Sequence, residues 1–230
     1  MNLLAIDSST SVLSIAAARG DDVFCAETQA EMKHSELVME MIDSQMKKAG
    51  LKAADLDGVL CMGGPGSFTG LRIAYSIAKG LSLSLGIPFV PVATLDCAAF
   101  PLRSCGLVLP VIQARKTAFF YTIFRGMERL MPDKDSSAGE IAAVIAEQTN
   151  KNEKITITGP GSPELFGALP DELKDRISLS FENRGYAKEL IAVAKNGNLF
   201  DNDNTAYLFS GPEYIRKTDA ELNLTGSIGN

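Results

Sequence analysis

The residues best suited to chemistry in this chain of 230 residues lie in a glycine-rich segment, 63–72. Glycines at positions 63, 64, 66 and 70 allow positive φ angles and a close approach of the backbone to a ligand. The apolar stretch that follows predicts a helix, and the unpaired N–H groups at a helix start attract anions. These features are typical of a phosphate-binding loop.

The residues after the last glycine do not fit the best-known loop of this kind. A Walker A loop requires a lysine and a hydroxyl residue at these positions. Leu71 and Arg72 stand there instead. A structural turn between a strand and a helix is therefore the alternative interpretation of the segment.

A second polar turn follows the first apolar strand. Its carboxylate and hydroxyl groups are suited to a phosphate or a magnesium-bound water, or else to a simple Asx turn. The candidate cofactor-binding residues are Asp7, Ser9, Thr10, Gly64 and Gly66. The corresponding position in the second half is Gln113, which carries no charge. Because phosphoryl transfer needs carboxylates to hold its metal ion, an efficient ATPase is not expected.

The single histidine, His34, cannot form a metal pair on a helix, because Ala30 and Val38 stand four residues before and after it. It is expected at a helix start or on the surface. The four cysteines form no Cys-x-x-Cys pair, which is typical of reduced thiols in a cytoplasmic protein. No Gly-x-Ser-x-Gly motif is present. The sequence thus predicts no catalytic residue and no metal site.

The formal net charge of −6 at pH 7 argues against direct, non-specific RNA binding. Contact with tRNA would be local, for which Arg115-Lys116 and Arg216-Lys217 are the candidates, or made through a partner. No signal peptide is recognised, and no apolar run approaches the ~20 residues that span a bilayer. A cytoplasmic protein without membrane contact is expected.

The pattern of apolar residues predicts the same order of elements twice. The first half predicts strands at 3–6, 12–18 and 23–28, a helix at 35–49, a strand at 59–62, a helix at 69–85 and a strand at 89–92. The second half predicts strands at 108–113, 118–124 and 127–131, a helix at 138–148, a strand at 155–158, a short helix, a strand at 177–180 and a helix at 186–195. This repetition predicts a duplicated RNase H-like α/β fold with lobes at 1–102 and 103–230.

The two long helices of the first lobe have apolar faces wider than packing on one side requires. Ser76, Gly80 and Ser84 also form a seam of small residues that allows another helix to approach. The predicted partner interface comprises Met39, Ile42, Met46, Leu71, Ile73, Ser76, Ile77, Gly80 and Ser84. Self-association into a homodimer through these helices is a further expectation, and burial by the second lobe is the alternative.

Several motifs resemble those of the bacterial TsaB (YeaZ) family. They lie at residues 4–10, 34–36, 64–73 (Gly-Pro-Gly-Ser-Phe-Thr-Gly-Leu-Arg-Ile), 78–81, 114–116 and 212–216. The resemblance spans nearly the whole chain, although residues 127–204 hold nothing diagnostic. Family members usually have Asp-Ala-Arg where this chain has Gln113-Ala114-Arg115, which argues further against nucleotide or metal binding by this chain alone.

The resemblance implies a two-lobed ASKHA (actin-like ATPase) fold. It also implies a part in making N6-threonylcarbamoyladenosine at position 37 of tRNAs that read ANN codons. The chain would be a non-catalytic subunit that dimerises with TsaD through its two N-terminal helices. The TsaE ATPase would dock on that heterodimer, and a TsaC-type enzyme would supply the adenylate. No intrinsic cofactor is implied, ATP or ADP is expected only at the partner interface, and tRNA is reached through the complex.

Two other functions remain open from the residues. An ATP-dependent small-molecule kinase of the ASKHA superfamily would use Asp7 and the glycine-rich segment. The uncharged Gln113 and the lack of an evident catalytic base argue against it. A glycoprotease ranks last because the sequence offers neither a metal site nor a catalytic triad.

Overall fold

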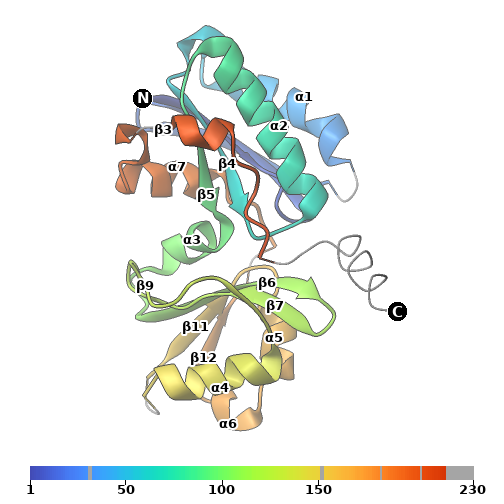
Figure 1. Cartoon of the computed structure of the whole chain (residues 1–230), viewed down its shortest axis with the longest axis vertical. Coiled ribbons are helices and arrows are strands. Elements are labelled where there is room, and N and C mark those ends of the chain that lie inside the picture. Colours follow the sequence, from blue (N-terminus) through green and yellow to red (C-terminus); the bar gives the residue numbers. More distant parts are fainter. Residues whose placement is uncertain (31–32, 151–152, 182, 203, 216–230) are drawn as a thin grey trace, which may run out of the picture.

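A computed structural model of the chain describes residues 1–30, 33–150, 153–181, 183–202 and 204–215. The chain forms two lobes, one above the other in Figure 1, and each lobe is built on its own β-sheet. Helices lie against the sheets, so the mixed α/β fold class predicted from the sequence is confirmed. The limits of 1–102 and 103–230 for the two domains stay a prediction.

The first sheet has five strands in the order β3-β2-β1-β4-β5. These are β1 (Asn2–Asp7), β2 (Val12–Arg19), β3 (Asp22–Gln29), β4 (Gly58–Gly64) and β5 (Phe89–Ala93). The first three form the predicted antiparallel meander, and β1, β4 and β5 are parallel. Side chains of β1 alternate between two cores, with Leu4 and Ile6 on one face and Leu3 and Ala5 on the other.

Two helices cover one face of the first sheet, α1 (His34–Lys48) and α2 (Phe68–Leu85). At the start of α2, the Ser67 hydroxyl accepts a hydrogen bond from the Gly70 N–H at 3.2 Å. The helix ends at Gly86, whose φ of 67° is the left-handed conformation that glycine adopts at low cost. The sequence predicted both helices to within two residues at each end.

The second sheet repeats the strand order of the first, as β10-β7-β6-β11-β12. Its elements are β6 (Leu107–Arg115), β7 (Ala118–Tyr121), β10 (Lys134–Ser137), α4 (Ala138–Gln148), β11 (Ile155–Thr158), α5 (Ser162–Ala168), α6 (Asp171–Lys174) and β12 (Ile177–Ser180). Two short strands, β8 (Phe124–Arg125) and β9 (Glu128–Arg129), pair beside β6. Short 3-10 helices occupy Ala53–Asp55, Phe100–Leu102, Leu199–Asp201 and Thr205–Leu208. The duplicated fold is therefore present.

The predicted strand at 127–131 is present only as the two-residue β9 (Glu128–Arg129), and its predicted place as the third strand of the second sheet is wrong, because that strand is β10. Gly126, with a φ of 62°, instead turns the chain so that β9 folds back on β8. The sequence of β10 is Lys-Asp-Ser-Ser, which has no apolar alternation, and the strand lies at the sheet edge. Hydrophobic periodicity therefore gave no signal for it.

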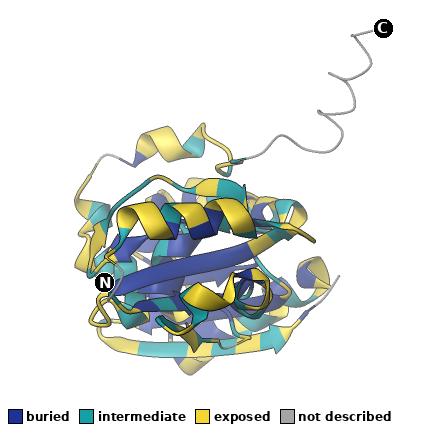
Figure 2. Cartoon of the chain, turned by 90° about the horizontal axis from the view of Figure 1, so that it is seen from below, coloured by how far each residue is buried: buried dark blue, intermediate teal, exposed yellow. Residues whose placement is uncertain are grey.

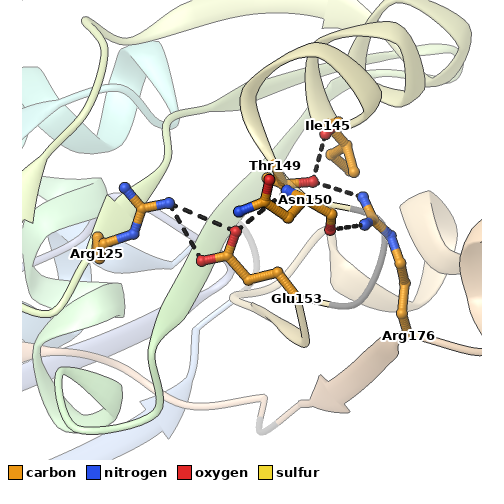
Figure 3. A network of polar contacts seen from close by, with 6 residues as sticks. All are labelled: Arg125, Ile145, Thr149, Asn150, Glu153 and Arg176. Atoms are coloured by element: carbon orange, nitrogen blue, oxygen red, sulfur yellow. Dashed lines mark hydrogen bonds and ion pairs between the residues drawn. The ribbon is translucent and has the colours of Figure 1, made fainter.

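A network of polar contacts connects three segments at one end of the second lobe (Figure 3). The Arg125 guanidinium forms an ion pair with Glu153 at 3.2 Å. Arg176, just before β12, donates to the Thr149 hydroxyl and to the Asn150 carbonyl at the end of α4. These contacts bring β8, the end of α4 and the start of β12 together.

Helix α7 (Ala187–Asn196) does not complete the second lobe as predicted. Its Leu190, Ile191 and Ala194 pack on the face of the first sheet opposite α1 and α2. That face is apolar and needs a cover, which α7 supplies together with residues of segment 97–98. The chain therefore crosses back to the first lobe after β12.

Helix α3 (Thr94–Ala99), which the sequence analysis missed, makes the other connection between the lobes. Its Cys97 and Ala98 belong to the core of the first sheet, and Ala99 packs with Val108 of the second. Figure 2 shows buried strands in the middle of the view, helices whose outer faces are exposed and, at the lower edge, a strand that is largely exposed or intermediate. None of the helices in the described part of the chain is both long and apolar enough to span a bilayer.

Candidate functional site

The glycine-rich loop packs tightly against the turn after β1. The Ser67 N–H donates to the Ser9 carbonyl at 2.7 Å, and the Ser8 hydroxyl donates to the Gly70 carbonyl at 2.7 Å. A Cβ atom at Gly70 would lie 1.8 Å from the Ser8 carbonyl oxygen, and one at Gly66 would lie 2.6 Å from that of Ser9. These contacts within the lobe account for both glycines without a ligand, which favours the structural interpretation of the loop.

Gly64 faces a different neighbour, the C-terminal strap, which we define as residues 209–215. The Glu213 N–H donates to the Gly63 carbonyl at 2.8 Å. Gly64 has a φ of 114°, and a Cβ there would lie 2.5 Å from the Glu213 carbonyl oxygen. The strap therefore lies directly on the loop, and glycine at position 64 is what lets it do so.

The Asp7 carboxylate is fully buried and engaged on both oxygens. Oδ1 accepts from the Ser9 N–H at 2.9 Å and the Ser9 hydroxyl at 2.6 Å, and Oδ2 accepts from the Tyr186 N–H at 2.7 Å. Burial raises the pKa of Asp7, while these hydrogen bonds act in the opposite direction. The first contact is the expected Asx turn, and the last attaches the start of α7 to the end of β1.

His34 begins α1, which confirms the first of the two positions expected for it, and its side chain is buried rather than on the surface. Its Nε2–H donates to the Thr10 carbonyl at 2.9 Å, which connects α1 to the turn after β1. The four cysteines are unpaired thiols. Within the described ranges, His, Cys, Asp and Glu side chains form no group of three that could hold a metal ion.

A second glycine loop occupies the equivalent place in the second lobe. Gly-Pro-Gly-Ser follows β4 at 64–67 and recurs after β11 at 159–162. The Gly161 N–H donates to the Val111 carbonyl at 3.1 Å, and a Cβ at Gly159 would lie 2.4 Å from that same oxygen. Sequence reasoning missed this correspondence, although the repeated tetrapeptide was a signal that could have found it.

A cleft of about 720 Å³ lies between the two glycine loops. Its lining includes Ser9, Thr10, His34, Pro65, Gly66, Ser67, Phe68, Ile112, Gln113, Pro160, Glu213 and Tyr214. Ser9, Thr10 and Gly66 of the cofactor-binding candidates therefore line one cavity, whereas Asp7 and Gly64 are not among its lining residues. Gln113 is exposed there and contributes no charge, and the strap contributes the acidic Glu213.

A groove of about 550 Å³ runs between α1 and α2 on the outside of the first lobe. It is lined by Ser35, Val38, Met39, Phe68, Thr69, Arg72, Ile73, Ser76 and Ile77. Both helices thus have an open outer face, so burial by the second lobe, the alternative considered from the sequence, is wrong.

The predicted interface residues fall into three groups. Met39, Ser76, Gly80 and Ser84 are exposed, Ile73 and Ile77 are half-buried, and Ile42, Met46 and Leu71 are buried in the cores of the first lobe. The last group is not accessible at the surface. A Cβ at Gly80 would meet no atom within 4 Å, so the small-residue seam faces open space.

The basic candidates for tRNA contact are only partly described. Arg115 lies 3.7 Å from the Asp135 carboxylate, and Lys116 is exposed in the turn between β6 and β7. Arg216 and Lys217 lie outside the described residues. The structure therefore describes the surroundings of the first basic pair but not of the second.

Two sheets of the same strand order, each with a glycine loop bordering a shared cleft, define a two-lobed protein of the ASKHA-like fold. The family model described as "TsaD: tRNA N6-adenosine threonylcarbamoyltransferase" matches residues 27–166. The chain belongs to this family, and the resemblance of its motifs to TsaB (YeaZ) proteins is confirmed.

Similar proteins support the family, and a similar solved structure supports the fold. The "tRNA threonylcarbamoyladenosine biosynthesis protein TsaB" of Bacillus subtilis is 27% identical over 229 residues, which cover 96% of each chain. The protein of the same name from Haemophilus influenzae is 33% identical over 126 residues, 53% of each chain. A Pseudomonas aeruginosa protein with similarity to peptidase YEAZ superposes with a TM-score of 0.78 at 20% identity, covering 94% of this chain and 99% of that one. The last similarity confirms the fold.

The packing of the first glycine loop predicts unequal effects for two glycines of α2. Gly70→Ala should lower the free energy of unfolding by about 3 kcal/mol or more, because its methyl group would collide with the Ser8 carbonyl. Gly80→Ala is the matched control and should raise it by up to about 1 kcal/mol, since its site is open and alanine favours helix. Urea unfolding followed by circular dichroism measures both, and equal midpoints would contradict the packing described.

The environment of Asp7 predicts a pH dependence. Its pKa is raised on folding above the unfolded value of 3.8, so its contribution to stability is greatest below that value and is lost as the pH rises through the folded pKa. The difference in unfolding free energy between wild type and Asp7→Asn should therefore shift in favour of wild type as the pH falls from neutral toward 3.8. Urea titrations of both proteins across this range test it; a flat difference, or one that grows with pH, would refute it.

Proposed function

We propose that this chain is a non-catalytic subunit that dimerises with TsaD and is required for threonylcarbamoylation of adenosine 37 in tRNAs that read ANN codons. Its curated relatives are named for tRNA threonylcarbamoyladenosine biosynthesis, and its family model is that of the transferase. This family membership supports a part in the modification of tRNA. The role of an activating partner without catalysis is the finer part of the proposal.

The open face of α1 and α2 is the observation that carries the proposal. Met39 is 55% exposed in the middle of α1. It lines the groove between α1 and α2. On α2, Gly80 has no side chain, and a Cβ there would have no neighbour within 4 Å. A groove of this kind suits an amphipathic helix of another protein, and small residues let that helix approach closely. We therefore assign TsaD binding to this face.

The polar contacts of Asp7 support the accessory role. Because both of its oxygens accept hydrogen bonds from the chain itself, Asp7 is poorly suited to hold a metal ion. The uncharged Gln113 stands at the corresponding turn of the second lobe. The kinase alternative would use Asp7 and the glycine-rich segment, and no observation favours it over the accessory role.

The other partners in the proposal rest on the resemblance to the TsaB family. In the proposed complex, TsaE acts on the heterodimer in the cytoplasm, a TsaC-type enzyme supplies the adenylate, and tRNA is bound by the complex as a whole. Any ATP or ADP lies at the interface with the partner. The chain alone would use the same face to form a homodimer, in competition with TsaD.

The proposal predicts a contrast between two exposed methionines. Met39→Glu should weaken TsaD binding at least about tenfold and abolish tRNA modification, because a charge would be buried in the interface. Met127→Glu is the matched control, since Met127 is 52% exposed on the second lobe, and it should behave as wild type. Isothermal titration with TsaD and a tRNA modification assay measure the two effects, with circular dichroism to verify folding.

Gly80→Leu provides an independent variant. A Cβ at position 80 would have no atom of the chain within 4 Å, so the fold should persist while the leucine fills the seam. If Met39→Glu and Gly80→Leu both bind TsaD like wild type and support modification, the proposed interface is wrong. If purified chain alone transfers the γ-phosphate of ATP, and Asp7→Ala removes that activity, the non-catalytic role is wrong.

A further inference from the structure

The C-terminal strap is attached to the first lobe at two points besides its contact with Gly64. The Glu213 N–H donates to the Gly63 carbonyl at the end of β4. The Lys79 ammonium group of α2 donates to the Ser210 carbonyl. The strap therefore has a defined position along α2, although it comes from the far end of the sequence.

The strap places Tyr214 on the first turns of α2, where it forms a stack with Phe68 and Arg72. The rings of Phe68 and Tyr214 have centroids 4.6 Å apart. The Arg72 guanidinium lies 3.8 Å from the Phe68 centroid, and its Nε–H donates to the Tyr214 hydroxyl at 3.2 Å. Two aromatic residues thus restrict the guanidinium of an otherwise exposed arginine.

Arg72 is also part of the groove between α1 and α2, where its neighbours in the lining include the apolar Met39, Ile73 and Ile77. Among the ion pairs of the described residues, none involves Arg72. Its Nε–H is used by Tyr214, which leaves the terminal amino groups for another acceptor. The groove therefore contains one oriented cation among apolar and hydroxyl-bearing side chains.

We propose that Arg72, held in place by Phe68 and Tyr214, binds a carboxylate on the helix that docks in this groove, so that the C-terminal strap is part of the docking surface. The inference rests on the proposed function, whose partner is TsaD. It adds the chemistry of that partner helix: apolar residues at helical spacing, with an aspartate or glutamate among them. It also assigns a role in docking to Tyr214, which lies on neither helix.

The positive charge of Arg72 would be matched by a negative charge on the docking helix, at a surface from which water is excluded on binding. A guanidinium pairs with a carboxylate through two parallel hydrogen bonds, and these are stronger away from water. An arginine that is already stacked and hydrogen-bonded loses less side-chain entropy when it binds. A buried cation without a partner would weaken docking, so the occupant is expected to supply the opposite charge.

A nucleic acid fits this site less well. Binding to phosphates depends on several clustered cations, whereas Arg72 is the only cation among the described residues that line the groove. The surroundings of Arg72 therefore favour a protein carboxylate.

The test measures TsaD binding to the full chain by isothermal titration at low and high salt. Arg72→Gln should raise the Kd about tenfold or more at low salt and flatten its salt dependence, because one ion pair is lost. Tyr214→Phe keeps the ring but removes the hydrogen bond to Arg72, and should raise the Kd by a smaller factor. Lys134→Gln removes one positive charge from an exposed site on the second lobe and should leave the Kd unchanged.

The outcomes separate this inference from the proposed function. If Arg72→Gln and Tyr214→Phe bind like wild type while Met39→Glu does not, the carboxylate contact is wrong and the helix interface stands. If Met39→Glu also binds like wild type, the interface itself is wrong. If Arg72→Gln weakens tRNA binding in a gel-shift assay but leaves TsaD binding intact, the cation serves RNA and the inference is overturned.

Discussion

The contact between each glycine loop and the end of the first strand of its lobe determines the arrangement of the molecule. In the first lobe, the Ser9 carbonyl lies against Gly66 so closely that no side chain fits between them. In the second lobe, Gly161 lies equally close to the backbone of Gln113. Helices α2 and α5 start within two residues of these glycines, so the contacts set where both helices begin. They also bring both loops to the border of the shared cleft.

The buried Asp7 extends this arrangement from the first lobe to the chain segment that returns from the second. Its hydrogen bonds to Ser9 and Tyr186 join the loop-bearing end of β1 to α7. A carboxylate near the start of a helix is favoured by the helix dipole. Asp7, whose carboxylate suggested catalysis, thus joins β1 to the segment that returns from the second lobe.

Sequence patterns predicted most elements because their causes are local. Alternating apolar residues in β1 and β2, the Ser67 cap and the left-handed Gly86 can be recognised from short segments. The polar edge strand β10, the position of α7 on the first sheet and the burial of His34 depend on distant parts of the chain. For the site, the sequence pointed to the glycine loop and the two helices. It marked residues 212–216 only as a family-like motif, since Tyr214 reaches Arg72 only after the chain is folded.

The return of α7 to the first sheet has a consequence for synthesis of the protein. Leu3 and Ala5 form part of a core that stays open until residues 187–196 have been made. A nascent chain that has completed only the first sheet therefore presents one apolar face to water, and such faces promote aggregation. The two lobes are consequently coupled during folding as well as in the final structure. The lobe that is translated first completes its core last.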